Sequence, residues 1–134
     1  MKKEELTKLA CEVMQKAYAP YSHFFVGAAL LTKKGKVYTG CNIENASYGA
    51  TNCAERTAIF KAVSEGERDF EAIAIVGGLQ GNLSGFAAPC GVCRQVMSEF
   101  CKENFKIILF DGRNYACKTL GELLPLAFSG DSII

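Results

Sequence analysis

Three cysteines and one glutamate have the spacing in this chain that most clearly indicates chemistry. Cys90 and Cys93 are separated by two residues, and Cys53 comes two residues before Glu55. A C-x-x-C pair is typical of structural zinc sites, of thiol–disulfide redox pairs and of catalytic zinc sites. Cys53 and the C-x-x-C pair are each expected to open a helix, where the helix dipole favours thiolate. That position suits all three kinds of site and does not separate them.

The redox alternative agrees poorly with the rest of the chain. The sequence has no tryptophan, and no proline lies in a later predicted strand, where a thioredoxin fold needs its cis-proline. A zinc site is therefore favoured. A structural zinc usually has four protein ligands, whereas a catalytic zinc keeps one position for water. Cys53, Cys90 and Cys93 supply three thiolates, and neither a second C-x-x-C nor a suitable histidine supplies a fourth ligand.

Charged residues beside these cysteines could complete a catalytic site. Three thiolates donate more charge to zinc than three imidazoles, so such a site needs positive compensation nearby. Arg56, one helical turn after Cys53, is expected to provide it, whereas a solvated surface position is favoured for Arg94. Glu55 is the natural general base, because a carboxylate beside zinc-bound water can take its proton, a contribution of about 10² to 10⁴ in rate.

Other potential ligands are expected to have ordinary structural roles. Cys11 falls in a predicted helix, Cys101 lies at the end of one, and Cys41 and Cys117 fall in predicted strands. Free cysteines are commonly small buried apolar residues, which is what we predict for these four. His23, the single histidine, lies in a turn before a strand and is expected to be exposed or locally hydrogen-bonded.

Composition limits the classes of function. The chain has 134 residues, of which 49% are apolar, enough for one globular domain over residues 1–134. Its net charge of +1 argues against nucleic-acid binding, which normally needs a basic stripe. The sequence has neither an apolar run long enough for a membrane span nor the pattern of a signal peptide. A cytoplasmic protein is therefore expected.

Apolar periodicity and turn residues predict the elements that must position these side chains. In chain order they are a helix over 6–17, strands over 24–32 and 37–43, a helix over 53–63, a strand over 70–76, a helix over 91–100, strands over 106–110 and 115–118, and a short helix over 119–125. The strands over 24–32 and 37–43 should form an antiparallel hairpin, and Thr119 with Glu122 has the pattern of a capping box. This order of elements is packed most simply as a sheet with helices on both faces, which buries the apolar side chains of both.

Cys53-Ala54-Glu55 followed by Pro89-Cys90-Gly91-Val92-Cys93 resembles the signature of the zinc nucleobase deaminases. Further segments, 18–22, 26–30, 40–48 and 123–125 with Phe128, are similar to the small bacterial cytidine deaminases. The similarity covers essentially the whole chain and is to the three-cysteine, homotetrameric form. It implies an α/β fold of three layers, α/β/α, around a mixed five-stranded sheet whose last two strands are antiparallel.

The resemblance also implies roles for individual residues. Cys53, Cys90 and Cys93 would bind one Zn²⁺ per subunit, Glu55 would shuttle protons, and Arg56 would bond to the ligand sulfurs. The implied substrate-binding groups are Phe24 against the pyrimidine, Asn42 and Glu44 on the ribose hydroxyls, backbone near Ala54 on the base edge, and Tyr48 and Phe128 in sites completed by neighbouring subunits.

The function implied is hydrolytic deamination of cytidine and 2′-deoxycytidine to the uridines with release of ammonia, in pyrimidine salvage. The binding partner is then a nucleoside, and binding to nucleic acid or to a membrane is not expected.

One alternative is a blasticidin-S-type deaminase, which should lack the segment 42–45 found here. A polynucleotide deaminase disagrees with the near-neutral charge. A non-catalytic zinc-stabilised binding module would need a fourth protein ligand. The glycine-rich segment 77–88 receives no role.

Overall fold

A mixed five-stranded sheet lies at the centre of the computed structural model, which describes residues 1–133. The strands are β1 (Phe24–Thr32), β2 (Val37–Cys41), β3 (Phe70–Leu79), β4 (Lys106–Phe110) and β5 (Tyr115–Thr119), in the spatial order β2-β1-β3-β4-β5. β3 and β4 are parallel, and every other neighbouring pair is antiparallel. The predicted first hairpin and the antiparallel last pair are both confirmed.

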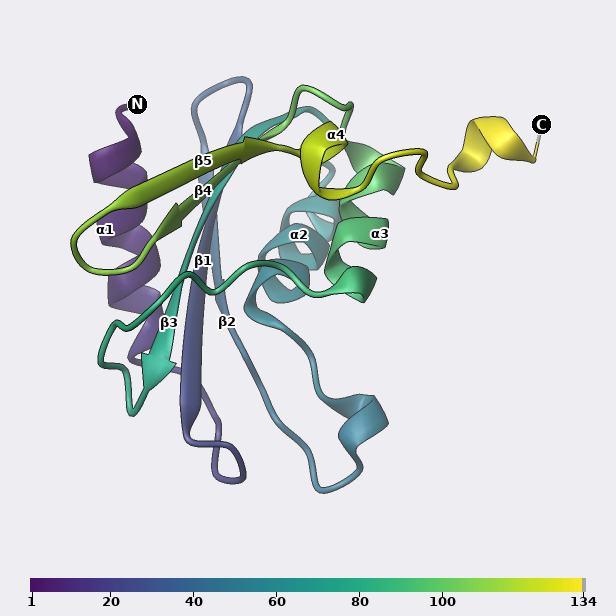
Figure 1. Cartoon of the computed structure of the whole chain (residues 1–134). Helices are drawn as coiled ribbons and strands as arrows, with labels where there is room; N and C mark the ends of the chain where they lie inside the picture. The colour runs from purple at the N-terminus through teal and green to yellow at the C-terminus, as the bar shows by residue number, and fades with distance from the viewer. Residues whose placement is uncertain (134) are drawn as a thin grey trace.

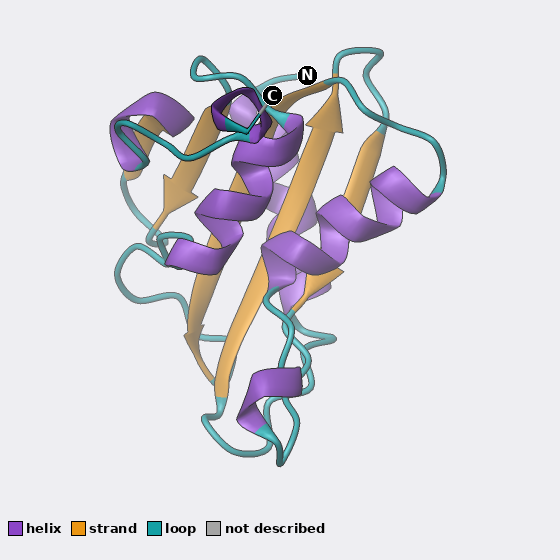
Figure 2. Cartoon of the chain, turned by 90° about the vertical axis from the view of Figure 1, so that its right-hand side faces the viewer, coloured by secondary structure: helices purple, strands orange, loops and turns teal. Residues whose placement is uncertain are grey.

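Helices cover both faces of this sheet. α1 (Lys3–Met14) lies on one face, and α2 (Ala54–Ser64) and α3 (Gly91–Phe100) lie on the other (Figure 1). Figure 2 shows α2 and α3 in front of the strands. The short elements are η1 (Tyr48–Ala50), α4 (Leu120–Leu123) and η2 (Gly130–Ser132). The predicted three-layer α/β/α fold is confirmed.

The core has two halves, one on each side of the sheet. Ala28 and Leu30 of β1 pack toward α2 and α3, whereas Ala29 and Leu31 pack toward α1. Successive side chains of a strand point to opposite faces. Because helices cover both faces, β1 is apolar at nearly every position rather than at alternate ones. The short α4 is capped at its N-terminus by the predicted capping box, in which the Glu122 amide donates to Thr119 Oγ1 at 3.2 Å.

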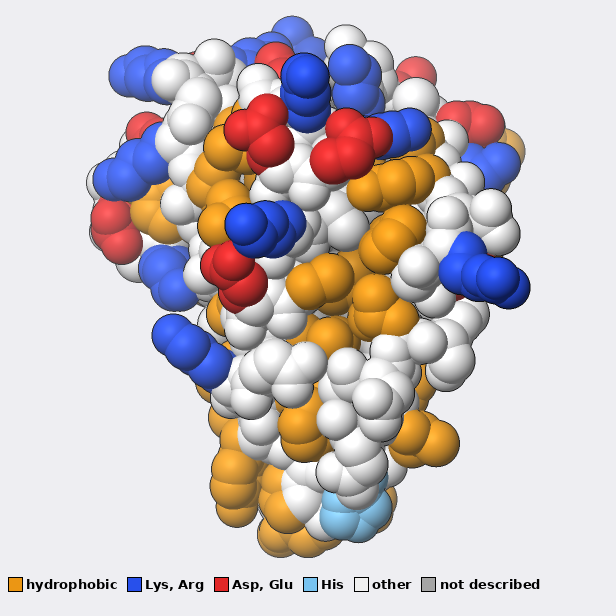
Figure 3. Space-filling view, turned by 90° about the vertical axis from the view of Figure 1, so that its left-hand side faces the viewer, with side chains coloured by type: hydrophobic (Ala, Val, Ile, Leu, Met, Phe, Trp, Pro, Cys, Tyr) orange, Lys and Arg blue, Asp and Glu red, His pale blue; other side chains and the backbone are white. Residues whose placement is uncertain are grey.

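On the face covered by α1, charges of both signs are interspersed (Figure 3). The single histidine, His23, lies at the lower end of this view; its amide donates to the Ala19 carbonyl at 3.0 Å, so it is locally bonded as expected. No helix within residues 1–133 has the length and apolar character needed to cross a membrane.

Some element ends differ from the prediction. α1 ends at Met14 rather than at residue 17, and β2 ends at Cys41 rather than at residue 43. β3 does not end at its two glycines but continues through them to Leu79, paired with the start of β1. A Cβ on Gly78 would lie 1.8 Å from the Asn82 carbonyl oxygen, so this glycine permits a close approach of the following loop.

The four cysteines other than Cys53, Cys90 and Cys93 are less buried than predicted. Cys11, Cys41 and Cys101 are half-buried, and Cys101 follows α3 as its C-cap. The prediction is wrong for Cys117, which is exposed. It lies on β5, at the edge of the sheet, and lines a cavity between this strand and the start of α1.

Gly40 of β2 allows α2 to lie close to the sheet. A Cβ there would be 2.6 Å from the Ala58 nitrogen and 2.7 Å from the Ala54 oxygen, both backbone atoms of α2. Since helix backbone cannot rotate away, we expect Gly40→Ala to lower the free energy of unfolding by about 1–3 kcal/mol. Denaturant unfolding measures this change. Gly130→Ala, with no atom within 4 Å, is the control; equal losses in the two variants would contradict the explanation.

Candidate active site

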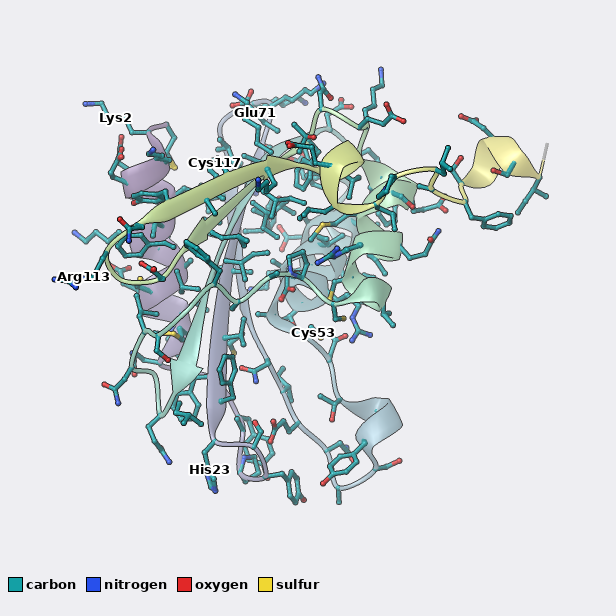
Figure 4. The ribbon with its side chains drawn as sticks, viewed as in Figure 1. Lys2, His23, Cys53, Glu71, Arg113 and Cys117 are labelled. Atoms are coloured by element: carbon teal, nitrogen blue, oxygen red, sulfur yellow. The ribbon has the colours of Figure 1, made fainter. Side chains whose placement is uncertain are left out.

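Three thiols from two helix starts meet on the α2–α3 side of the sheet. Cys53 is the N-cap of α2, Cys90 is the N-cap of α3, and Cys93 lies in the first turn of α3. Their sulfurs all lie within 4.8 Å of one another, with Cys53–Cys90 at 3.8 Å and Cys90–Cys93 at 3.5 Å. In a tetrahedron with Zn–S bonds of about 2.3 Å, ligand sulfurs are about 3.8 Å apart. The cluster therefore fits a single zinc ion. Figure 4 shows Cys53 beside α2 and α3, away from His23.

The protonation of these thiols reflects their close contact. The hydrogen bond with Cys93 lowers the pKa of Cys53 to about 5, and Arg56, whose Nη2 donates to the Cys53 sulfur at 3.2 Å, adds to this effect. The same Cys53–Cys93 hydrogen bond, with burial, raises the pKa of Cys93. This close contact favours the thiolate form of Cys53, which is the form that binds a metal cation.

Glu55 lies beside this cluster at the start of α2. Its side chain is only 4% exposed, and burial raises its pKa to about 7. A carboxyl group with that pKa can take up and give back a proton near neutral pH. Within residues 1–133 no fourth Cys, His, Asp or Glu joins the three sulfurs. Three protein donors with a free fourth position are the arrangement of a catalytic zinc rather than a structural one.

A cleft of about 480 Å³ opens beside the cluster. Its lining residues are Phe24, Val26, Asn42, Thr51, Asn52, Cys53, Ala54, Glu55, Phe86, Ala87, Ala88 and Cys90. The volume is within the usual range for small-molecule sites. Asn42 holds the start of β1 in place, because its Oδ1 accepts from the Val26 amide at 2.9 Å and its Nδ2 donates to the Phe24 carbonyl at 2.8 Å.

Two of the predicted substrate-binding residues lie in a neighbouring hollow. Glu44 and Tyr48 line it with Tyr21 and Ser22, and Thr51 lines both this hollow and the cleft. The Glu44 carboxylate accepts hydrogen bonds from the hydroxyl and amide of Ser22, and the hydroxyl contact lowers its pKa. Glu44 is therefore a fixed negative charge at the border of the cleft.

Phe128 is the predicted substrate-binding residue that lines neither the cleft nor the neighbouring hollow. Its side chain is 62% exposed, and its carbonyl accepts from Gln95 Nε2 at 2.8 Å, on the outer side of α3. Arg94 also lies away from the sulfurs. Its Nε donates to the Pro89 carbonyl at 2.7 Å and its Nη1 to the Leu123 carbonyl at 2.8 Å. Arg94 therefore connects the segment before Cys90 to α4.

A sequence model of the cytidine and deoxycytidylate deaminase zinc-binding region matches residues 1–109. The chain belongs to this deaminase family. A cytidine deaminase from Halalkalibacterium halodurans is 50% identical over 134 residues, covering 99% of this chain and 98% of that protein. The crystal structure of a cytidine deaminase from Burkholderia pseudomallei is 50% identical, with a TM-score of 0.89, and the match covers 96% of this chain and 100% of that one. A blasticidin-S deaminase from Bacillus cereus is 33% identical over 129 residues, and the match covers 93% of this chain and 91% of that protein.

Family membership and the sulfur geometry agree on the cofactor. This deaminase is an enzyme, and its Cys53, Cys90 and Cys93 fit one zinc ion per subunit. The fold, the family and the zinc cofactor predicted from the sequence are thereby confirmed.

One wall of the deaminase cleft was not predicted from the sequence. Phe86, Ala87 and Ala88 line it, but the segment that contains them received no role. A signal was available, because these residues come directly before Pro89 and Cys90. A chain that places Cys90 at the metal must also bring the preceding residues to the cleft.

Proposed function

We propose that this deaminase hydrolyses cytidine and 2′-deoxycytidine to uridine and 2′-deoxyuridine, with release of ammonia, in cytoplasmic pyrimidine salvage. The observation that carries the proposal is the buried Glu55, with a pKa near 7, on the wall of a cleft shared with Cys53 and Cys90. Similarity to cytidine deaminases at 50% identity supports this substrate class.

Glu55 would handle the protons of the reaction. When bound, zinc supplies Lewis acidity that lowers the pKa of water to about 7. Glu55 takes a proton from the attacking water and gives it to N3 of the base, while the water oxygen bonds to C4. Glu55 then carries the second proton of that water to the 4-amino group. The C4–N bond breaks, and the amino group leaves as ammonia.

The other predicted residues would orient the nucleoside. Phe24 and Ala54 both line the cleft; Phe24 would offer an aromatic face to the pyrimidine, and the Ala54 backbone would bind the base edge. Asn42 Oδ1 uses one lone pair on the Val26 amide and keeps another for a ribose hydroxyl. The Glu44 carboxylate, at the border of the cleft, would accept from the neighbouring hydroxyl.

Arg56 would compensate the charge of the thiolates, since its guanidinium bonds to the Cys53 sulfur at 3.2 Å. Hydrogen bonds to charged groups contribute about 1.5–3 kcal/mol, so Arg56→Met is expected to lower kcat about tenfold to a hundredfold. Steady-state kinetics with zinc content measured in parallel tests this expectation. Arg68→Met is the control, because Arg68 donates to the Val63 and Glu67 carbonyls instead. Equal kcat values in the two variants would exclude a charge-compensating role.

Assembly is part of the proposal. Tyr48 and Phe128 are 77% and 62% exposed, which supports their use in sites completed by neighbouring subunits of a homotetramer. Light scattering is then expected to give about four times the subunit mass of 14.5 kDa. A fully active monomer would refute shared sites.

The decisive experiment is ultraviolet absorbance of cytidine and of 2′-deoxycytidine with the zinc-loaded protein, next to its Glu55→Ala variant. We expect absorbance to fall with the unchanged protein alone, together with stoichiometric ammonia. Blasticidin S is assayed in parallel. Turnover of blasticidin S without turnover of cytidine would replace the proposed substrate, and no turnover of either with zinc bound would reject it.

A further inference from the structure

The loop between β3 and α3 has a defined path, and its first part packs on the α1 side of the sheet. Gln80, Gly81 and Gly85 have positive φ values of 55°, 81° and 70°. The Gln80 amide donates to the His23 carbonyl at 2.7 Å, and Leu83 packs into the core half on the α1 side. The first part of the loop is therefore anchored to other elements before the chain reaches the cleft.

The second part of the loop forms a wall of the cleft. After the left-handed turn at Gly85, Phe86 and Ala87 both line the cleft that also holds Phe24. A Cβ on Gly77 would lie 3.0 Å from Ala87 Cβ and 3.0 Å from Phe24 Cε2. Ala87 and the Phe24 ring thus both lie against Gly77, and Phe86 precedes Ala87 along this wall.

Both aromatic rings remain free to bind a flat ligand. Phe86 is 45% exposed, so part of its ring is accessible to a ligand in the cleft. The aromatic ring pairs within residues 1–133 are Tyr21–Tyr48 and Phe110–Tyr115, so Phe24 and Phe86 do not stack on each other. Aromatic faces bind nucleobases by stacking whatever the base sequence.

We propose that Phe86 is a second aromatic base-binding residue of this deaminase, which contacts the pyrimidine from a different wall of the cleft than Phe24. The inference rests on the proposed function and assigns a role to the loop. Its contact covers the base and limits water around it. Phe86 therefore contributes to substrate affinity, whereas proton transfer depends on Glu55.

Binding can be measured apart from turnover by calorimetric titration of cytidine into the zinc-loaded Glu55→Gln protein. Because base stacking weakens on removal of one ring and Phe86 is half-exposed, Phe86→Ala in this background is expected to raise the Kd about fivefold to tenfold. Phe86→Tyr keeps the ring and should keep the Kd. In the otherwise unchanged enzyme, Phe86→Ala should raise KM by a similar factor and change kcat less.

Phe60→Ala is the matched control, because Phe60 is 46% exposed, lies on α2 and does not line the cleft. Gly85→Ala tests the path of the loop. Gly85 and Gly66 both have positive φ and no atom within 4 Å of an added Cβ, so alanine strains only the backbone at either position. KM should rise in Gly85→Ala and stay unchanged in Gly66→Ala.

The outcomes separate this inference from the proposed function. A higher Kd in Phe86→Ala, with an unchanged Kd in Phe86→Tyr and Phe60→Ala, supports the inference. If the Glu55→Gln protein binds cytidine and Phe86→Ala binds it equally well, Phe86 is not a base-binding residue, and the proposed function stands. If the unchanged enzyme neither binds nor deaminates cytidine, both proposals fail.

Discussion

Glu55→Gln is expected to lower kcat for cytidine by about 10² to 10⁴-fold, the usual contribution of a positioned proton carrier. Glutamine has nearly the shape of glutamate and keeps its hydrogen-bonding capacity, but it cannot take a proton from water and pass it on. Glu55 is 4% exposed, so its carboxylate form is costly to bury, as the pKa of about 7 indicates. A neutral amide avoids that cost, and the variant should therefore fold and unfold at no lower temperature than the unchanged protein.

The measurement is kcat and KM for cytidine, with zinc content and thermal unfolding on the same samples. Glu65→Gln is a suitable control, because Glu65 caps the other end of α2 and its exposed carboxylate lies 3.8 Å from Lys36. It should keep full kcat. A Glu55→Gln protein with unchanged kcat would remove Glu55 from the proton pathway. A protein without deaminase activity in either form would instead favour the zinc-stabilised binding module.

Local sequence signals predicted most of the fold. The predicted bounds 24–32, 91–100 and 106–110 coincide with β1, α3 and β4, because apolar runs and turn residues mark both ends of each. The exception at β3 has a tertiary cause. Gly77 and Gly78 are typical of a strand end by local propensity, yet both pair with β1, and Gly78 makes room for Asn82. A contact with a returning loop is not encoded in the strand itself.

The candidate site divides in the same way. The metal centre was predictable, because Cys53, Cys90 and Cys93 are fixed at helix starts by spacing that can be read locally. The wall formed by Phe86, Ala87 and Ala88 was not predictable. Phe86 reaches the cleft through the positive φ of Gly85 and the anchoring of the loop between β3 and α3. The substrate-binding roles of the remaining residues stay predictions.

Cys93→Ala is expected to remove zinc and to lower activity more than about 100-fold. Even changes to groups that only support a metal ligand cost about 10 to 100-fold in metal affinity or activity, and Cys93 is itself one of the three clustered sulfurs that fit the metal. It is also the deepest of the three, with 0% exposure, so neither water nor a neighbouring side chain can easily replace its sulfur. Each tenfold loss of zinc affinity also reduces the stabilisation by bound metal by about 1.4 kcal/mol.

Elemental analysis of zinc and thermal unfolding with and without a chelator measure both effects. The unchanged protein should hold one zinc per subunit and unfold at a lower temperature after chelation. Cys93→Ala should hold little zinc and respond little to the chelator. Cys101→Ala is the matched control, because it removes a sulfur from the same core half, eight residues along the chain and outside the cluster. If Cys93→Ala keeps stoichiometric zinc and full activity, the metal is not held by this cluster, and the three sulfurs are only neighbours in the core.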